Sequence, residues 1–163
     1  MKIVVLDGFT LNPGDLSWEK MEEFGEVTVY ENTPHELIYE RAREADVLFT
    51  NKTPLVANML EKLKNLKYIC VLATGYNIVD VDAAKNLGIP VSNIPAYSTN
   101  SVAQLTFALI LELCHHVQNH SNAVKAGEWT KCRDFCFWNY PLTELEGKTI
   151  GIIGFGNIGQ KVA

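Results

Sequence analysis

Short apolar runs separated by polar turns dominate the first hundred residues of the chain. We interpret five of these runs as strands, at residues 3–6, 27–30, 47–49, 68–72 and 89–92. The unbroken apolar character of the first run is typical of a strand that is buried on both faces of a parallel sheet. Helical patterns occupy the intervals between the runs. The sequence therefore predicts an α/β fold with a flavodoxin-like, doubly wound parallel sheet.

Capping residues and apolar periodicity predict the helices between these strands. Thr33, followed by Pro34 and Glu36, is a typical helix start. Apolar residues at helical spacing predict a helix over 55–66. Asp80 is expected to cap a further helix that Gly88 ends.

The pattern changes after residue 99. Ser101 and Gln104 form a capping-box pair at the start of a long helix that runs to about His120. This helix is apolar on nearly every side, which predicts burial all round and packing against two domains. Residues 128–146 then hold many aromatic side chains with little periodicity. We name residues 128–146 the aromatic arm. Its aromatic side chains fit either a protein–protein interface or a loop folded over the chain's own core.

Composition narrows the class of protein. Of the 163 residues, 47% are hydrophobic and 20% are charged, and the net charge is −5. These values describe a globular chain with ample core, and without a basic block they argue against nucleic acid or an anionic membrane as a partner. The apolar run after Met1 is too short for a signal peptide. Four cysteines without disulfide-framework spacing favour a reduced, cytoplasmic protein.

A more specific interpretation of two of the cysteines, together with two histidines, is a zinc site. His116 and His120 lie four residues apart on a predicted helix, and Cys132 and Cys136 would complete a Cys2His2 set. The three residues between the cysteines include no tight knuckle and lie in an aromatic stretch, unlike most zinc ligand pairs. Buried thiols and surface histidines explain the residues more simply, and we expect no metal.

The last part of the chain carries a glycine motif. An apolar run at 149–153 leads directly into Gly154-Phe155-Gly156-Asn157-Ile158-Gly159. A strand that breaks into this spacing begins a dinucleotide-binding unit, in which the backbone approaches a pyrophosphate. The alternative is a glycine-rich turn between any strand and helix. Such a unit needs about 30 residues, so we expect the chain to be the N-terminal part of a larger protein.

Ligands of doubly wound sheets bind at the carboxyl ends of the strands. After the fourth run the chain continues as Thr74-Gly75-Tyr76, where successive N–H groups can bind a carboxylate. Lys52, after the third run, would add positive charge, although a solvated lysine is the simpler interpretation. A phospho-acceptor receiver domain shares this fold but needs an acidic pair after the first strand and Asp after the third. The chain has a single Asp7 and then Thr50-Asn51-Lys52, which excludes that class.

Several segments in order resemble the D-2-hydroxyacid dehydrogenases. They are residues 73–80 (Ala-Thr-Gly-Tyr-Asn-Ile-Val-Asp), 101–106 (Ser-Val-Ala-Gln-Leu-Thr), 127–129 (Gly-Glu-Trp) and 145–159, which ends in the glycine motif. The Gly-Tyr-Asn sequence, with Tyr97-Ser98-Thr99 before the long helix, is most similar to the glycerate dehydrogenase (hydroxypyruvate reductase) members.

The resemblance implies a domain organisation and an activity. Residues 1–98 correspond to the substrate domain, and residues 99–163 to the hinge helix, a dimerisation arm and the first strand and turn of a Rossmann NAD-binding domain. The activity would be an oxidoreductase reaction: hydride transfer between NAD, with NADP also open, and a small D-2-hydroxy acid or 2-oxo acid such as glycerate or hydroxypyruvate. The protein would be a homodimer.

The resemblance also implies roles for residues. The substrate carboxylate would bind at Thr74, Gly75 and Tyr76 with Lys52 nearby, and the cofactor at Thr74 and in the motif Gly154, Gly156, Asn157, Ile158 and Gly159. The family's catalytic Arg, Glu and His lie beyond the glycine motif, so we expect none in this chain and no activity from it alone. None of the four histidines, His35, His115, His116 and His120, matches the catalytic one. A non-catalytic, NAD-binding regulatory relative is the alternative.

Overall fold

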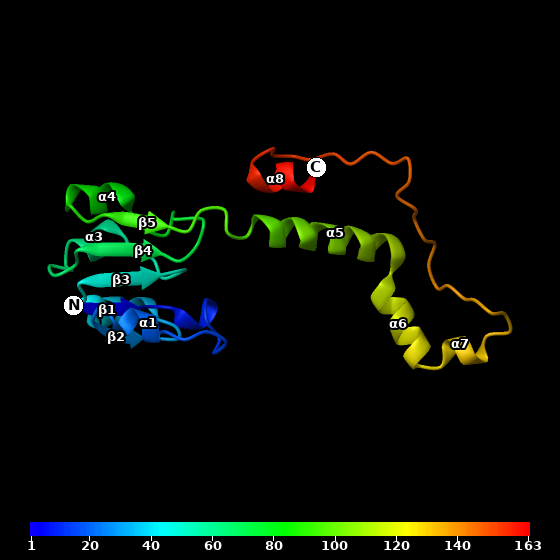
Figure 1. The fold of residues 1–163 in the computed structure, drawn as a ribbon, viewed down its shortest axis with the longest axis horizontal. Coiled ribbons are helices and arrows are strands. Elements are labelled where there is room, and N and C mark those ends of the chain that lie inside the picture. The colour runs from blue at the N-terminus through cyan, green and yellow to red at the C-terminus, as the bar shows by residue number, and fades with distance from the viewer. The chain divides into compact units, whose positions relative to one another are not determined.

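The computed structural model describes residues 1–163, which form two compact units, Met1–Pro95 and Ala96–Ala163. The first unit holds one parallel sheet with the strand order β2-β1-β3-β4-β5 (Figure 1). This order is that of flavodoxin-like folds, so the predicted fold class is confirmed. The strands are β1 (Lys2–Val5), β2 (Glu26–Val29), β3 (Val47–Thr50), β4 (Tyr68–Val71) and β5 (Val91–Asn93).

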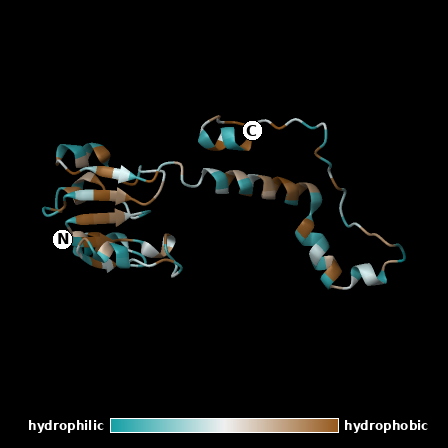
Figure 2. Cartoon of the chain, viewed as in Figure 1, coloured by the Kyte–Doolittle hydropathy of each residue, from teal (hydrophilic) through white to brown (hydrophobic).

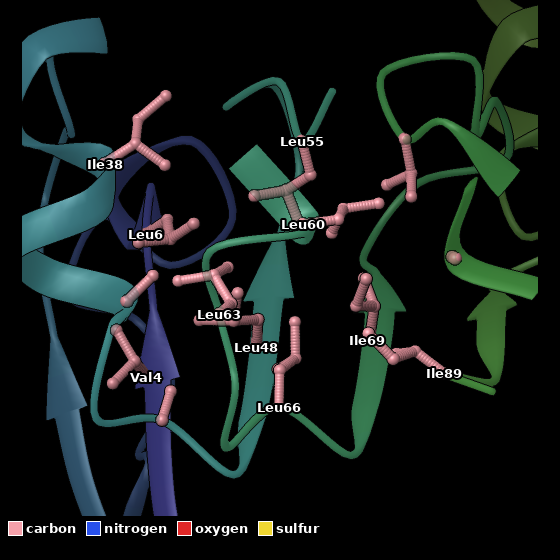
Figure 3. Close-up of a cluster of buried hydrophobic side chains, with 14 of the residues drawn as sticks. Val4, Leu6, Ile38, Leu48, Leu55, Leu60, Leu63, Leu66, Ile69 and Ile89 are labelled. Carbon is pink, nitrogen blue, oxygen red and sulfur yellow. The ribbon is translucent and has the colours of Figure 1, made fainter. Parts of the chain in front are cut away.

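The core lies between the sheet and its helices. Val4, Leu48 and Ile69 of neighbouring strands pack in one buried cluster with Ile38 and with leucines that follow β3 (Figure 3). Parallel pairing aligns these strand residues, because Ile3 is opposite Val47, and Leu48 is opposite Ile69. The register therefore fixes which strand ends meet at the carboxyl edge of the sheet.

Short helices connect the strands of the first unit. They are η1 (Gly8–Thr10), α1 (Glu19–Glu22), η2 (His35–Leu37), α2 (Ile38–Ala42), α3 (Ala57–Leu60) and α4 (Val81–Asn86). The predicted cap of α4 is confirmed, since Asp80 Oδ1 accepts a hydrogen bond from Ala83 N at 2.9 Å. The predicted cap at Thr33 is wrong. Its buried hydroxyl donates instead to the carbonyl of Leu6, and the chain enters a 3-10 turn before α2.

The helix predicted over 55–66 is much shorter than expected. Only Ala57–Leu60 is α-helical, and the chain then continues through turns in which Leu63 N bonds Leu60 O and Leu66 N bonds Leu63 O. These leucines are spaced by three residues, which suits turns with i to i+3 bonds better than an α-helix. All three leucines are nevertheless buried, so the apolar pattern correctly identified core residues.

The second unit contains α5 (Thr99–His115), α6 (Val117–Lys125), α7 (Glu128–Lys131) and α8 (Asn157–Val162). The expected capping box is wrong, because α5 begins two residues before Ser101 and its N-cap Ser98 makes no side-chain capping bond. The predicted single helix is also divided, since His116 adopts a left-handed conformation with φ of 49° between α5 and α6.

The apolar surface of α5 is largely exposed, whereas the sequence predicted burial on all sides. Leu105, Leu109 and Leu113 are 58%, 57% and 76% exposed, and Ala103 alone is fully buried along the helix. Within this unit α8 packs against α5 (Figure 1). Figure 2 shows hydrophobic residues concentrated both in the central strands of the first unit and along α5. No helix of the structure is both long and apolar enough to cross a bilayer.

The strand predicted at 149–153 is absent. These residues form no ladder, and Ile153 is fully exposed. A strand requires a neighbour to pair with its backbone, and no segment of the described chain pairs with this one. The turn and helix that were predicted to follow it are present, as described below.

Candidate functional site

The loop after β4 lies at the carboxyl edge of the sheet. Its residues Thr74, Gly75 and Tyr76 are all exposed. The loop is anchored to β5, because Asn93 Nδ2 donates to the carbonyl of Thr74 at 2.8 Å and Thr74 Oγ1 donates to Ile94 O at 3.2 Å. A Cβ added at Gly75 would meet only Asn77 Oδ1, at 3.4 Å. The backbone at Gly75 is thus open to a ligand and its flanks are held.

Lys52 lies in the turn after β3, the strand next to β4. This turn and the loop after β4 are joined at both ends. Before them, Leu72 N donates to Thr50 O at 2.8 Å, and after them Leu55 N donates to Ile78 O at 2.9 Å. The Lys52 side chain is exposed at this edge. The structure therefore gathers the predicted substrate residues Lys52, Thr74, Gly75 and Tyr76 at one edge of one unit.

The sequence analysis missed a buried carboxylate at the same edge. Asp7 follows β1 and is only 2% exposed. Its Oδ1 accepts from Asn51 N at 2.8 Å, and its Oδ2 accepts from Thr53 N at 2.8 Å and also from Lys52 N. In the sequence, Asp7 indicates only that the chain is not a receiver domain. The available signal was a polar turn, Thr-Asn-Lys-Thr, after the neighbouring buried strand.

The glycine motif adopts the geometry that a dinucleotide turn requires. Gly154 has a φ of +90°, which side-chain-bearing residues rarely adopt. A Cβ on Gly159 would stand within 2.1 Å of the Gly154 carbonyl, so the helix and the turn are in close contact there. Gly156 is the N-cap of α8, and a Cβ on it would meet nothing within 4 Å. The backbone at Gly154, Gly156 and Gly159 is therefore that of a tight turn packed closely on the start of a helix, as the glycines of a dinucleotide-binding motif require.

The histidines and cysteines proposed as zinc ligands make other contacts. The ring of His116 lies 4.8 Å from that of Tyr140, and His120 Nδ1 is 3.0 Å from the carbonyl of His116. Cys132 Sγ donates to the carbonyl of Cys136 at 3.5 Å. All four cysteines are free, and no group of three or more His, Cys, Asp or Glu side chains is arranged to hold a metal.

A doubly wound parallel sheet followed in the chain by a glycine-rich turn before a helix is typical of nucleotide-dependent α/β enzymes. The sequence model for "D-isomer specific 2-hydroxyacid dehydrogenase, catalytic domain" matches residues 3–155. The chain belongs to this family. The resemblance found in the sequence is therefore confirmed.

Individual relatives agree with this assignment. A hydroxypyruvate reductase of Blautia hydrogenotrophica is 54% identical over 163 residues, which cover 98% of this chain and 51% of that protein. A glycerate dehydrogenase of Methylorubrum extorquens is 37% identical over 164 residues, with 99% and 51% covered. Among solved structures, an acyclic imino acid reductase in complex with NADPH and D-Arg superposes with a TM-score of 0.78 at 32% identity, covering 99% of this chain and 51% of that one. The chain spans about half the length of the curated relatives it matches.

Proposed function

We propose that this chain is the N-terminal part of a dehydrogenase that transfers a hydride between NAD(P) and a small D-2-hydroxy acid or its 2-oxo acid. The observation that carries the proposal is the carboxyl edge of the sheet, where the loop with the open backbone at Gly75 and the turn with the exposed Lys52 follow the paired strands β4 and β3. Backbone N–H groups and an ammonium together suit a small carboxylate. The match of residues 3–155 to the family supports assigning that carboxylate to the substrate.

Hydroxypyruvate and glycerate are the proposed substrate pair. Two relatives that cover nearly the whole chain carry the names hydroxypyruvate reductase and glycerate dehydrogenase. In the proposed complex, the N–H groups of Thr74, Gly75 and Tyr76 bind the substrate carboxylate. Lys52 attracts the same group electrostatically. This arrangement orients the 2-oxo carbon for reduction.

The proposed cofactor is NAD, with NADP as the alternative. Its pyrophosphate would lie on the turn of Gly154, Gly156, Asn157, Ile158 and Gly159, and the family resemblance implies that the cofactor also contacts Thr74. The nicotinamide supplies the hydride when it is bound. A solved relative holds NADPH, so both cofactors are to be assayed.

The catalytic acid–base residues belong, in our proposal, to the sequence that follows the glycine motif. The family resemblance implies an Arg, a Glu and a His there. A continuation that lacks them would favour the alternative, an NAD-binding regulatory relative without turnover. Sequencing the gene beyond codon 163 distinguishes the two.

We further propose that the protein is a homodimer and that it acts in the cytoplasm. Two aromatic residues of the arm, Phe135 and Trp138, are 90% and 67% exposed, as interface anchors are before assembly. The four free cysteines agree with a reducing compartment.

Oxidation of NADH and NADPH with a panel of 2-oxo acids tests the proposed function. The protein extended to the length of its relatives should reduce hydroxypyruvate or glyoxylate, and Lys52→Ala should raise the KM for the oxo acid. Residues 1–163 alone should show no activity above a blank, because they contain no proposed catalytic residue. Turnover by the 163-residue chain, or none by the extended protein, would contradict the proposal.

A further inference from the structure

Asp7 is hydrogen-bonded to the turn that carries Lys52 and has no role in the function proposed so far. Its carboxylate accepts the backbone N–H groups of three consecutive residues, Asn51, Lys52 and Thr53. Thr53 Oγ1 adds a fourth hydrogen bond at 3.1 Å. Successive N–H groups that converge on one point form an anion-binding concavity. Here the bound anion is a side chain of the protein itself, so the concavity holds the turn rather than a ligand.

Side chains of the same turn are also fixed by hydrogen bonds. Thr50 Oγ1 donates to the carbonyl of Thr53 at 2.9 Å, which closes the turn from the other side. Asn51 Nδ2 donates to Thr10 Oγ1 at 2.9 Å, and Thr10 Oγ1 donates to Asp7 O at 2.9 Å. Thr50, Asn51 and Thr53 are buried, and Lys52 is exposed. The ammonium of Lys52 is therefore the polar group that this turn presents to a ligand.

The turn is also fixed relative to the loop that would bind the substrate. Thr50 pairs with Val71 where both segments begin, and Leu55 pairs with Val79 where both end. Asp80 N donates to Leu55 O at 3.0 Å in this second pairing. The base of the Lys52 side chain consequently has one position beside the loop of Thr74–Tyr76.

We propose that Asp7 is a positioning residue for the site of the 2-oxo acid. It holds the backbone at Lys52 so that the ammonium stands beside the loop of Thr74–Tyr76 and attracts the carboxylate of the substrate. This inference rests on the proposed function. A lysine side chain is flexible, and a fixed backbone leaves only its own rotamers to be ordered when substrate binds.

The test uses the extended protein and the variants Asp7→Asn, Lys52→Ala and the double variant. Asp7→Asn keeps the shape but places an amide N–H against backbone N–H groups. It should raise the KM for the 2-oxo acid by about twofold to fivefold, the upper part of the range for a partly exposed charge pair, with kcat and the KM for NADH nearly unchanged. In the Lys52→Ala background, Asp7→Asn should add less than about twofold, because both changes act through one group.

Asp46→Asn is the matched control. Asp46 also accepts a backbone N–H, that of Lys2 at 2.7 Å, but it lies just before β3 at the opposite end of the sheet. It should leave the KM for the oxo acid unchanged. Hydrogen exchange at the amides of residues 51–53 should accelerate in Asp7→Asn and not in Asp46→Asn. If Asp7→Asn does not fold, Thr53→Val, which removes one of the four hydrogen bonds, should raise the same KM by a smaller factor.

The outcomes separate the two proposals. A wild type that reduces no 2-oxo acid removes the proposed function, and the positioning role with it. An active wild type whose KM is unchanged in Asp7→Asn, or in Thr53→Val where the first variant is unfolded, removes the positioning role alone. A full, multiplicative effect of Asp7→Asn in the Lys52→Ala background also overturns it, since Asp7 would then not act through Lys52.

Discussion

Two carboxylates occupy opposite ends of the sheet in the first unit and are held differently. Asp7, at the carboxyl edge, is buried and bonded to backbone N–H groups. Asp46, at the amino edge, accepts from Lys67 Nζ at 2.7 Å and from Lys2 N at 2.7 Å. The hydrogen bond from Lys67, followed by that from the backbone of Lys2, lowers the pKa of Asp46 from its usual 3.8.

This pKa gives Asp46 a defined effect on stability. Because the folded protein holds the pKa below the usual value, the charged carboxylate stabilises the fold above pH 3.8 and ceases to do so as the pH falls through the folded pKa. Asp46→Asn should therefore lower the free energy of unfolding at neutral pH, and the difference from wild type should shrink below about pH 4. Urea unfolding at neutral and acidic pH measures this. A difference that grows in acid would contradict the assignment.

Gly75→Val tests the loop after β4. The only atom near an added Cβ is Asn77 Oδ1 at 3.4 Å, so the fold should accept the change while the branched side chain blocks the approach of a carboxylate. In the extended protein the KM for the oxo acid should rise about tenfold to a hundredfold, the value of a hydrogen bond to a charged group. The affinity for NADH and the melting temperature should stay near those of wild type. An unchanged KM would remove this loop from the site.

At the scale of elements, strands were predicted better than helices. All five predicted runs overlap β1 to β5. β1, β3 and β4 are mostly buried and leave continuous apolar runs, whereas β2 and β5 are only partly buried. A predicted helix start was wrong where the capping side chain binds another partner, as the Thr33 hydroxyl donates to the carbonyl of Leu6. The helix predicted over 55–66 is α-helical only at Ala57–Leu60, because leucines spaced by three residues suit successive turns as well as a helix. Residues Thr74–Tyr76 and Lys52 were predicted as substrate residues because parallel strands put their carboxyl ends at one edge, and their role remains a prediction.

The turn before α8 offers a test with an internal control. Gly156→Ala should leave the turn intact, since its Cβ would meet nothing, but should weaken NADH binding by filling the space proposed for the pyrophosphate. Gly159→Ala should disturb the turn even without cofactor, because its Cβ would stand 2.1 Å from the Gly154 carbonyl. Fluorescence titration with NADH and thermal unfolding of both variants in the extended protein separate the two effects. Equal NADH affinity of Gly156→Ala and wild type would contradict a pyrophosphate at this turn.

At the scale of the whole molecule, the aromatic arm divides into inward and outward side chains. Phe137 lies 6.2 Å from the rings of both Trp129 and His120, and Tyr140 lies 4.8 Å from His116. Trp129 Nε1 donates to the carbonyl of Phe135 at 2.9 Å, which folds the arm back on α7. Phe135 and Trp138 remain exposed. The arm is thus packed on its own helices, and Phe135 and Trp138 are its most exposed aromatic side chains.

We predict that Trp138 anchors the proposed two-fold dimer. Trp138→Ala should weaken dimerisation of the extended protein, by about tenfold or more in Kd if it is a central anchor. Phe137→Ala is the matched control. It should lower the thermal stability of the protein, because Phe137 contacts the arm's own helices, and it should leave the oligomeric state unchanged. Sedimentation at matched concentrations measures both. A wild type that is monomeric at concentrations on the order of tens of micromolar, a Kd weaker than a stable interface gives, would contradict the proposed dimer.

By itself the sequence determined the fold class, the family and the strand-end residues, because buried parallel strands, glycine turns and segment order are local properties of the chain. The hydrogen bonds of Asp7 could not be predicted from the sequence, since its partners Asn51, Lys52 and Thr53 lie more than forty residues away along the chain. The pattern of α5 likewise identified apolar side chains, but it did not predict that most of them are exposed in the structure. Periodicity reports which residues favour burial, whereas hydrogen-bond partners and strand pairing depend on segments that meet only when the chain folds.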